Sequence, residues 1–309
     1  MRIKVLSEKN HAGMILYNHF EKNQYLCSKR GLCLSMWNYY TKYNLDPFDS
    51  IPLSFPVRGS EDPMFKIFET VYHRHHDNAN SVWIVKPGHC QNQGKGIRCY
   101  SKFRDIKKRV DKFGHIMIIQ KYMEKPLLIE KRKFDIRAYV MCTDFEPEGF
   151  TAYFYPWLYI RTSGVDYSID NLGDRLIHLV NDAVQMKSAT YSKASNKEAC
   201  KMSQQEFEEY MSKELGIDCE NKIYPQIKNL MWDSIRATHH KMNENKVKGC
   251  FEIFGYDLMV DSDLKVWTIE VNTNPSWSLT TSWHAQIIPH LLKKNFLKKI
   301  FGYLARCEF

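Results

Sequence analysis

The sequence lacks the segments that mark secreted and membrane proteins. No stretch approaches the roughly 20 apolar residues that a membrane helix needs, and the opening MRIKVLSEKN carries charge with no apolar run behind it. No internal repeat and no low-complexity tract is present among the 309 residues. With 44% hydrophobic and 14% aromatic residues, the composition predicts a globular protein with a sizeable core and not a disordered chain.

The sequence also lacks paired cysteines. Its nine cysteines are an odd number with no CxxC pair, and its one histidine cluster, HRHH at 73–76, lacks the spacing of zinc ligands. We interpret this cluster as part of a solvated loop. The cysteines are then free thiols, which favours a reducing compartment such as the cytoplasm.

Acidic residues are fewer than basic ones. The chain has 35 Asp and Glu against 44 Lys and Arg, a net charge of +9. The basic residues gather in 101–113, 130–137 and 291–301. This excess indicates an acidic partner, either nucleic acid or an acidic protein tail, although each run by itself also fits a solvated helix face.

The stretch SVWIVKPGHCQNQGKGIRCYSKF, residues 81–103, reads as a strand that runs into a glycine loop. Five residues separate Gly88 from Gly94, and Gly96 follows Lys95, so the spacing is not that of a Walker loop. No glycine stands at the third place of the dinucleotide fingerprint either. Two interpretations remain open, a phosphate-holding loop of another kind and a flexible hairpin tip.

Periodicity and breakers predict a chain of mixed strands and helices. We expect a helix over 32–43, an extended connector over 46–56, and a helix that begins at Asp62 and Pro63. A basic helix to about residue 113 follows, and then a long helical section over 197–243 that we expect to be interrupted near Gly216 and at Pro225. Strands are expected over 82–85, 115–123, 133–143 and 151–161, with a final hairpin over 250–275. This order favours an α+β fold with a central antiparallel sheet.

The final hairpin is the most informative segment. Apolar residues alternate over 254–260 and again over 267–271, and a two-residue turn at Ser262 and Asp263, pairing Asp261 with Leu264, would put both sets on one face. The opposite face would then carry the oxygen-bearing side chains of three residues, Asp257, Glu270 and Asn272. Hard oxygen ligands in small number suit Mg²⁺. An ordinary solvent face is the alternative, but Asp257 interrupts an otherwise apolar run, which favours the metal site.

Basic residues in two further strands fit chemistry on phosphate. Lys133, Asp135 and Arg137 of KFDIRAYV share one face, and two cations there could clamp phosphate oxygens. Arg161, at the end of WLYIR, is suited to a bidentate contact with a carboxylate. In IIQKYMEKPLLI, the backbone groups of 120–123 could hydrogen-bond a base.

Seven motifs occur together in order: WIVKPG…GKGI, IIQKYMEKPLLI, RKFDIRAYV, YIRTS, IHLVNDAVQ, FEIFGYDLMVD and WTIEVNTNP. In this order they resemble the tubulin-tyrosine-ligase-like family, over about residues 18–301. The resemblance implies an ATP-grasp fold, with nucleotide held between two antiparallel-sheet lobes. It also implies an N-terminal substrate-side domain over 1–78, a central lobe over 79–145 and a C-terminal lobe over 146–309.

The resemblance implies a role for each matching residue. The nucleotide would be held by Lys86 and the glycine loop with Gly94 and Gly96 at its phosphates, by Gln120, Lys121, Tyr122 and Met123 at its base, and by Asn181. Lys133 would reach toward phosphate, Asp135 and Arg137 would shape the catalytic centre, and Arg161 would bind the carboxylate of an amino acid. Mg²⁺ would lie on Asp257, Glu270 and Asn272.

The implied reaction uses ATP and Mg²⁺ to join a free amino acid to a carboxylate of tubulin or a similar acidic protein through an acyl phosphate. Glutamate or glycine is favoured, with tyrosine as a third option. The implied location is the cytoplasm and cytoskeleton, with cilium and basal body as further sites, and no membrane partner is expected. Two alternatives are a catalytically weak microtubule-binding member and, less favoured, a nucleic-acid-binding protein.

The chain departs from the family's usual pattern at a few positions. Val180 stands in HLVN where threonine is common, so a hydroxyl that could contact ligand is lost. Gly164 stands in RTSG where serine is frequent. Trp277 and Trp283 follow the metal strand, and we expect them to pack within the C-terminal lobe or to close over a ligand.

Overall fold

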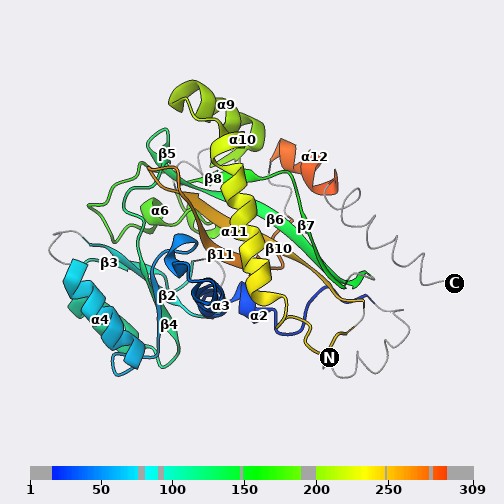
Figure 1. Ribbon diagram of the computed structural model, residues 1–309. Coiled ribbons are helices and arrows are strands. Elements are labelled where there is room, and N and C mark those ends of the chain that lie inside the picture. Colours follow the sequence, from blue (N-terminus) through cyan, green and yellow to red (C-terminus); the bar gives the residue numbers. More distant parts are fainter. Residues whose placement is uncertain are drawn as a thin grey trace.

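Two antiparallel sheets lie side by side in the computed structural model shown in Figure 1. The structure describes residues 16–75, 81–89, 94–146, 149–188, 200–247, 249–277 and 281–290. The mixture of helices and antiparallel strands agrees with the predicted fold class. None of the helices within these ranges is long and apolar enough to cross a membrane.

The smaller sheet has four strands in the order β1-β4-β2-β3. They are β1 (Ser54–Val57), β4 (Met117–Lys121), β2 (Trp83–Pro87) and β3 (Arg98–Tyr100). Helices α4 (Pro63–His75) and α5 (Phe103–Lys112) cover one face, where Phe68, Trp83 and Ile106 are fully buried. The other face, which carries Lys86 and Gln120, turns toward the large sheet.

Helix α4 begins where the sequence predicts. The Asp62 carboxylate accepts the Met64 N–H at 2.9 Å, which caps the helix. The interpretation of the histidine cluster as a loop is wrong for its first three members, because residues 73–75 form the last turn of α4. His76 lies outside the described residues. The buried face of α4 runs from Phe65 through Phe68 to Tyr72, directly before the cluster, and the helix extends one turn beyond it.

The larger sheet has the order β11-β10-β6-β8-β9. Its strands are β11 (Val266–Thr273), β10 (Phe251–Val260), β6 (Arg132–Glu146), β8 (Tyr159–Thr162) and β9 (Lys201–Ser203), and two more, β5 (Leu128–Ile129) and β7 (Gly149–Phe154), pair with β6. The single strand predicted over 151–161 is therefore two strands, β7 and β8. Pro156 lies in the break, and proline has no N–H to donate to a sheet.

Alternation along β6 separates the core from the site. Phe134, Ile136 and Ala138 face the main hydrophobic core, where helices α2 (Gln24–Cys27), α3 (Lys29–Lys42) and α11 (Tyr224–Thr238) pack. Lys133, Asp135 and the following odd-numbered residues face the opposite side. Helix α3 contacts both β1 and β11, so it lies where the two sheets meet (Figure 1).

The remaining helices are short or peripheral. They are η1 (Pro47–Asp49), α6 (Arg175–His178), α7 (Asp182–Gln185), α9 (Gln204–Leu215), α10 (Cys219–Lys222) and α12 (Ser282–His290). The predicted break at Gly216 is confirmed: this glycine ends α9 with φ 65°. The predicted interruption at Pro225 is confirmed as well: α10 ends at Lys222, and Pro225 stands in the first turn of α11.

A buried carboxylate fixes the chain before α2 to the large sheet. Glu252, on β10, is 1% exposed and accepts four hydrogen bonds. The donors are His19 Nδ1 at 2.9 Å, the Phe20 N–H at 2.9 Å, Asn23 Nδ2 at 2.8 Å and Thr273 Oγ1 at 2.6 Å. Because α2 and α3 follow this segment directly, the anchor also sets the position of α3.

Each sheet joins strands from both sides of a predicted domain boundary. Strand β1 lies before residue 78 and pairs with β4, while β6 lies almost wholly before residue 146 and pairs with β8 and β10. The three segments 1–78, 79–145 and 146–309 therefore do not correspond to three separate sheets. As a division into domains they stay a prediction.

Candidate functional site

The hairpin that carries the carboxylates is longer at its turn than predicted. Asp261 pairs with Lys265 and not with Leu264: its N–H donates to the Lys265 carbonyl at 3.0 Å, and Leu264 takes a left-handed φ of 63°. Asp261 Oδ1 supports this three-residue turn by accepting the N–H groups of Asp263 and Lys265, each at 2.9 Å.

A bulge then restores the predicted arrangement farther along the strands. The register shifts between Asp257 and Leu258, so that Asp257 lies opposite Glu270 while Leu258 lies opposite Thr268. The prediction that Trp267 and Ile269 share the core face is wrong, because the longer turn moves both to the other side. The prediction that Asp257, Glu270 and Asn272 share a surface is confirmed.

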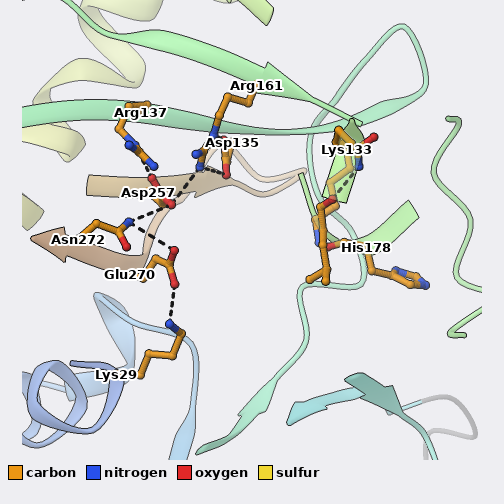
Figure 2. A network of polar contacts seen from close by, with 11 residues as sticks. Lys29, Lys133, Asp135, Arg137, Arg161, His178, Asp257, Glu270 and Asn272 are labelled. Carbon is orange, nitrogen blue, oxygen red and sulfur yellow. Dashed lines mark hydrogen bonds and ion pairs between the residues drawn. The ribbon is translucent and has the colours of Figure 1, made fainter. Parts of the chain in front are cut away.

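Asp257 lies at the centre of a buried network of charges (Figure 2). Arg137 Nε donates to Asp257 Oδ1 at 2.6 Å, and Arg161 Nη2 lies 2.9 Å from Asp257 Oδ2. Arg161 also makes a two-point contact with Asp135, at 2.7 and 2.5 Å. Two carboxylates of this chain therefore occupy the Nε and Nη2 edge of Arg161, and its role in binding an amino-acid carboxylate stays a prediction.

Burial and charge act in opposite directions on the acidic groups here. Burial, only partly offset by Arg161, raises the pKa of Asp135 to about 6. For Glu270, burial would also raise the pKa, but Lys29 and then Lys86 hold it well below its usual range. Lys29 Nζ lies 2.8 Å from Glu270 Oε2. Glu270 is thus ionised at any ordinary pH.

Two buried lysines flank the carboxylates. Lys86 is 3% exposed, and its ammonium group donates to Gln120 Oε1 at 2.7 Å. Lys133 donates to the Tyr122 hydroxyl at 2.9 Å and to the His178 carbonyl at 3.3 Å. Burial lowers the pKa of each lysine to about 8. Both are held by neutral acceptors, so their charges stay available for an anion.

The hydroxyl of Tyr122 is held in turn by His178. The imidazole Nε2 lies 2.9 Å from the Asn171 carbonyl, so it carries the proton, and Nδ1 accepts from the Tyr122 hydroxyl at 2.8 Å. Burial lowers the pKa of His178, which keeps the ring neutral. This chain of contacts fixes where Lys133 points.

These groups line one pocket between the two sheets. The empty space within it, including the part that is open to solvent, is about 690 Å³. Ile84 and Ile97 on one side and Met259 and Ile269 on the other supply apolar surface, as a planar base requires. The N–H groups of Lys121 and Tyr122 already donate to backbone carbonyls. That of Met123 donates to no backbone carbonyl within the described ranges.

The structure brings most of the predicted site residues together. Those that line the pocket are Lys86, Gln120, Lys121, Tyr122, Met123, Lys133, Asp135, Asn181, Asp257 and Glu270. Arg137, Arg161 and Asn272 contact the lining carboxylates from behind. The roles assigned to these residues remain predictions.

Gly94 and Gly96 lie beside the pocket and do not line it. Residues 90–93 of the glycine loop lie outside the described ranges. Gly96 has φ 78°, and a Cβ there would stand 2.9 Å from Pro87 Cγ, so no other residue fits without a shift. Their contact with phosphate stays a prediction.

The departures from the family pattern have clear positions. Val180 is buried and lines the pocket, so the missing hydroxyl would have faced it. A Cβ at Gly164 would stand 2.6 Å from Ser188 Oγ, which leaves no room for a serine side chain. Trp277 stacks on Tyr139 and Trp283 packs against Tyr159, so both tryptophans pack against the large sheet.

Sequence analysis missed two residues of the site. Lys29 is a single lysine at the start of a helix, and nothing in its sequence neighbourhood indicates a carboxylate partner. His178 stands within the IHLVNDAVQ motif, but its hydrogen bonds depend on the fold. Only the structure brings either residue to the pocket.

The donor set fits a magnesium ion. Asn272 Nδ2 lies 3.3 Å from both Asp257 Oδ2 and Glu270 Oε1. Exchanging the amide nitrogen and oxygen, which look alike in most structures, would turn a third oxygen toward the same point. Among the described residues no group of three His, Cys, Asp or Glu is placed to hold a metal. A cation would therefore rest on two carboxylates, an amide, substrate oxygens and water, as Mg²⁺ often does.

Comparison with known proteins gives relatives of one kind. The chain is 33% identical to tubulin glycylase 3B of Tetrahymena thermophila over 224 residues, which are 71% of this chain and 18% of that protein. It is 29% identical over 310 residues to the probable alpha-tubulin polyglutamylase Ttll1 of the same organism, covering 92% of this chain and 71% of the relative. Human tubulin monoglutamylase TTLL4 is 28% identical over 84% of this chain and 21% of its own length.

The chain thus spans about a fifth of the glycylase and monoglutamylase relatives and most of the polyglutamylase. The family model described as "Tubulin-tyrosine ligase family" matches residues 6–304, nearly the whole sequence. That match covers both sheets, the pocket between them and every residue of the charged network. The chain belongs to the tubulin-tyrosine ligase family.

Proposed function

We propose that this chain is an ATP- and Mg²⁺-dependent ligase of ATP-grasp architecture that joins glutamate or glycine to a carboxylate of tubulin or a similar acidic protein. One observation supports this most directly. Three carboxylates that line the pocket, Asp135, Asp257 and Glu270, are surrounded by five cations, which are Lys29, Lys86, Lys133, Arg137 and Arg161. The excess of two positive charges matches the two negative charges of a magnesium–ATP complex.

The base and the phosphates would occupy different ends of the pocket. Met123 offers the base a backbone N–H that donates to no backbone carbonyl in the described part of the chain, between apolar walls that include Ile84 and Met259. Lys86 and Lys133 would bind phosphate oxygens, where two positive charges in a low-dielectric site stabilise the charge that develops during transfer. A bound Mg²⁺ would be held by Asp257, Glu270 and Asn272 and would neutralise phosphate charge.

Arg137 and Arg161 would act mainly by orientation. Each is buried and contacts Asp257, so together they fix the direction of this carboxylate. Asp135 holds Arg161 from the other side. Orientation of this kind matters because two anions, the acceptor carboxylate and the terminal phosphate, must be brought within bonding distance.

The reaction forms one amide bond for each ATP. An oxygen of the acceptor carboxylate attacks the γ-phosphorus and ADP leaves, which gives an acyl phosphate. The amine of the amino acid then attacks the acyl carbon, and inorganic phosphate and a proton are released. The relatives named above are glycylases and glutamylases, which supports glycine or glutamate as the amino acid. The chain's +9 charge suits an acidic acceptor.

A location in the cytoplasm and on the cytoskeleton, including cilia, is part of this proposal and follows from the acceptor. A catalytically weak microtubule-binding protein is the second candidate, and Val180 on the pocket wall is the observation that favours it. Nucleic-acid binding would not explain the buried network of charges.

A label-transfer assay tests the proposal. Purified protein, Mg-ATP and tubulin are incubated separately with radiolabelled glutamate, glycine and tyrosine. We expect incorporation of glutamate or glycine, lost in Glu270→Gln. Glu244→Gln is the matched control, because Glu244 is exposed and pairs with Lys22 away from the pocket. Absence of any label, with the protein still sedimenting with microtubules, would support the second candidate.

A further inference from the structure

Lys29 reaches the pocket from a part of the chain far from the other charged groups. It is the first residue of α3, and its side chain is 10% exposed. Its ammonium group lies 2.8 Å from Glu270 Oε2, while the other Glu270 oxygen faces Asn272 (Figure 2). The contact therefore falls on one of the three groups that would hold Mg²⁺.

The start of a helix is an unfavourable place for this lysine. Helix N-termini carry partial positive charge, and α3 has no acidic residue in its first turn to compensate. Ser28 caps the helix by accepting the Gly31 N–H at 2.9 Å. The helix therefore does not need Lys29 for its stability. The contact with Glu270 explains why a lysine stands at this position.

Two cations cannot share this carboxylate without cost. Unit charges about 4 Å apart in a partly buried site repel strongly, so a metal ion on Glu270 and the ammonium group of Lys29 oppose one another. A nucleotide changes this balance, because its phosphates carry enough negative charge to accommodate both. Lys86, a second cation near Lys29, adds to the repulsion and to the attraction for phosphate.

We propose that Lys29 takes the place of the metal on Glu270 while the nucleotide is absent and becomes a ligand of the nucleotide's phosphates when metal and nucleotide are bound. The consequence is coupling. Metal alone binds weakly, and nucleotide and metal strengthen each other's binding by the same factor. Lys29 would then touch the substrate and belong to the reacting site, and the inference rests on the nucleotide site proposed above.

Metal binding to the nucleotide-free protein is the direct test. Mn²⁺ serves as the probe, with free Mn²⁺ measured by electron paramagnetic resonance. We expect Lys29→Met to bind Mn²⁺ at least about tenfold more tightly than wild type. A tenfold change corresponds to only a small part of the electrostatic repulsion between Lys29 and the metal that the substitution removes. Lys29→Arg keeps the charge and should bind as weakly as wild type. Glu270→Gln should abolish the gain in a double variant with Lys29→Met.

The matched control is Lys265→Met. Lys265 also pairs with a carboxylate, Asp49, at 2.7 Å, but on the surface of the large sheet. It should leave Mn²⁺ binding unchanged. In parallel, calorimetry with ADP at saturating Mg²⁺ should show weaker binding to Lys29→Met by about tenfold, because one charge-assisted contact to phosphate is lost.

The outcomes separate this inference from the proposed function. If wild type binds ADP but Lys29→Met, shown to be folded by its unfolding transition, has unchanged Mn²⁺ affinity, the role of Lys29 is refuted and the nucleotide site stands. If wild type binds neither ADP nor ATP under any condition, both proposals fall. Tighter Mn²⁺ binding in Lys29→Met together with weaker ADP binding supports the exchange.

Discussion

Nucleotide binding should weaken steeply as the pH rises past 8. Lys86 and Lys133 are the buried cations proposed to bind phosphate, and burial lowers the pKa of each to about 8. An ordinary lysine has a pKa of roughly 10.4 and keeps its charge throughout this range. In this pocket, deprotonation of the lysines removes the charge that attracts the nucleotide, so the affinity for the nucleotide decreases as the pH rises.

The size of the effect follows from the two pKa values. With a pKa of about 8, the charged fraction of one lysine falls roughly tenfold between pH 7 and pH 9, and two such lysines give about a hundredfold loss of affinity. Few other groups interfere. Burial raises the pKa of Cys33 to about 12 and that of Cys99 to about 11, so both thiols stay neutral. The phosphates of the nucleotide are already fully ionised in this range, because the pKa of their final ionisation is roughly 6.

Calorimetric titration with ADP across pH 7 to 9.5, without metal, measures this directly. Above pH 8, binding should also take up protons, which is seen when the titration is repeated in buffers of different ionisation enthalpy. Lys86→Arg keeps its charge and should reduce the loss to about tenfold, the share of Lys133 alone. Affinity that stays within twofold up to pH 9 would refute the reasoning that both buried lysines bind the phosphates in their charged form.

Three further outcomes are expected. Gly96→Ala should lower the free energy of unfolding by about 1–2 kcal/mol and weaken ADP binding. Gly149→Ala is the control, because Gly149 also has a positive φ but has open space around it, and it should affect stability alone. A normal ADP affinity in Gly96→Ala would contradict this prediction. Glu252→Gln should cost about 2 kcal/mol in urea unfolding, because one amide oxygen cannot accept from four donors; an unchanged transition would contradict the anchor. Arg161→Met leaves two buried carboxylates short of a partner and should cost about 3–5 kcal/mol, measured by the same unfolding assay; a loss below 1 kcal/mol would refute it.

The sequence carried enough information to place the carboxylates on one surface but not to explain how. Period-two alternation predicted that Asp257 and Glu270 face away from the core, and this is confirmed. The longer turn was not visible because it depends on Leu264 adopting a left-handed conformation, which favours glycine or asparagine. The bulge after Asp257 compensates for that turn, and neither feature has a residue signal of its own.

Contacts between distant segments were the least predictable part of the site. The lysine on Glu270 comes from the first turn of α3, and the pairing depends on how α3 packs against β11. The hydrogen bonds from Lys133 through Tyr122 to His178 link β6, the residue after β4 and α6. Local patterns report which face of an element is buried, but they do not report which elements become neighbours.

The anchor at Glu252 has a consequence for how the protein is made. His19 and Glu252 lie 233 residues apart in the chain, and the pocket needs groups from both regions. During synthesis on the ribosome, the early segment must therefore wait until the last strands of the large sheet have left the exit tunnel. Contacts of such long range also make folding slow. Nucleotide binding by a nascent chain would then report that nearly the whole family-matching region has been translated and folded, since shorter chains lack one side of the pocket.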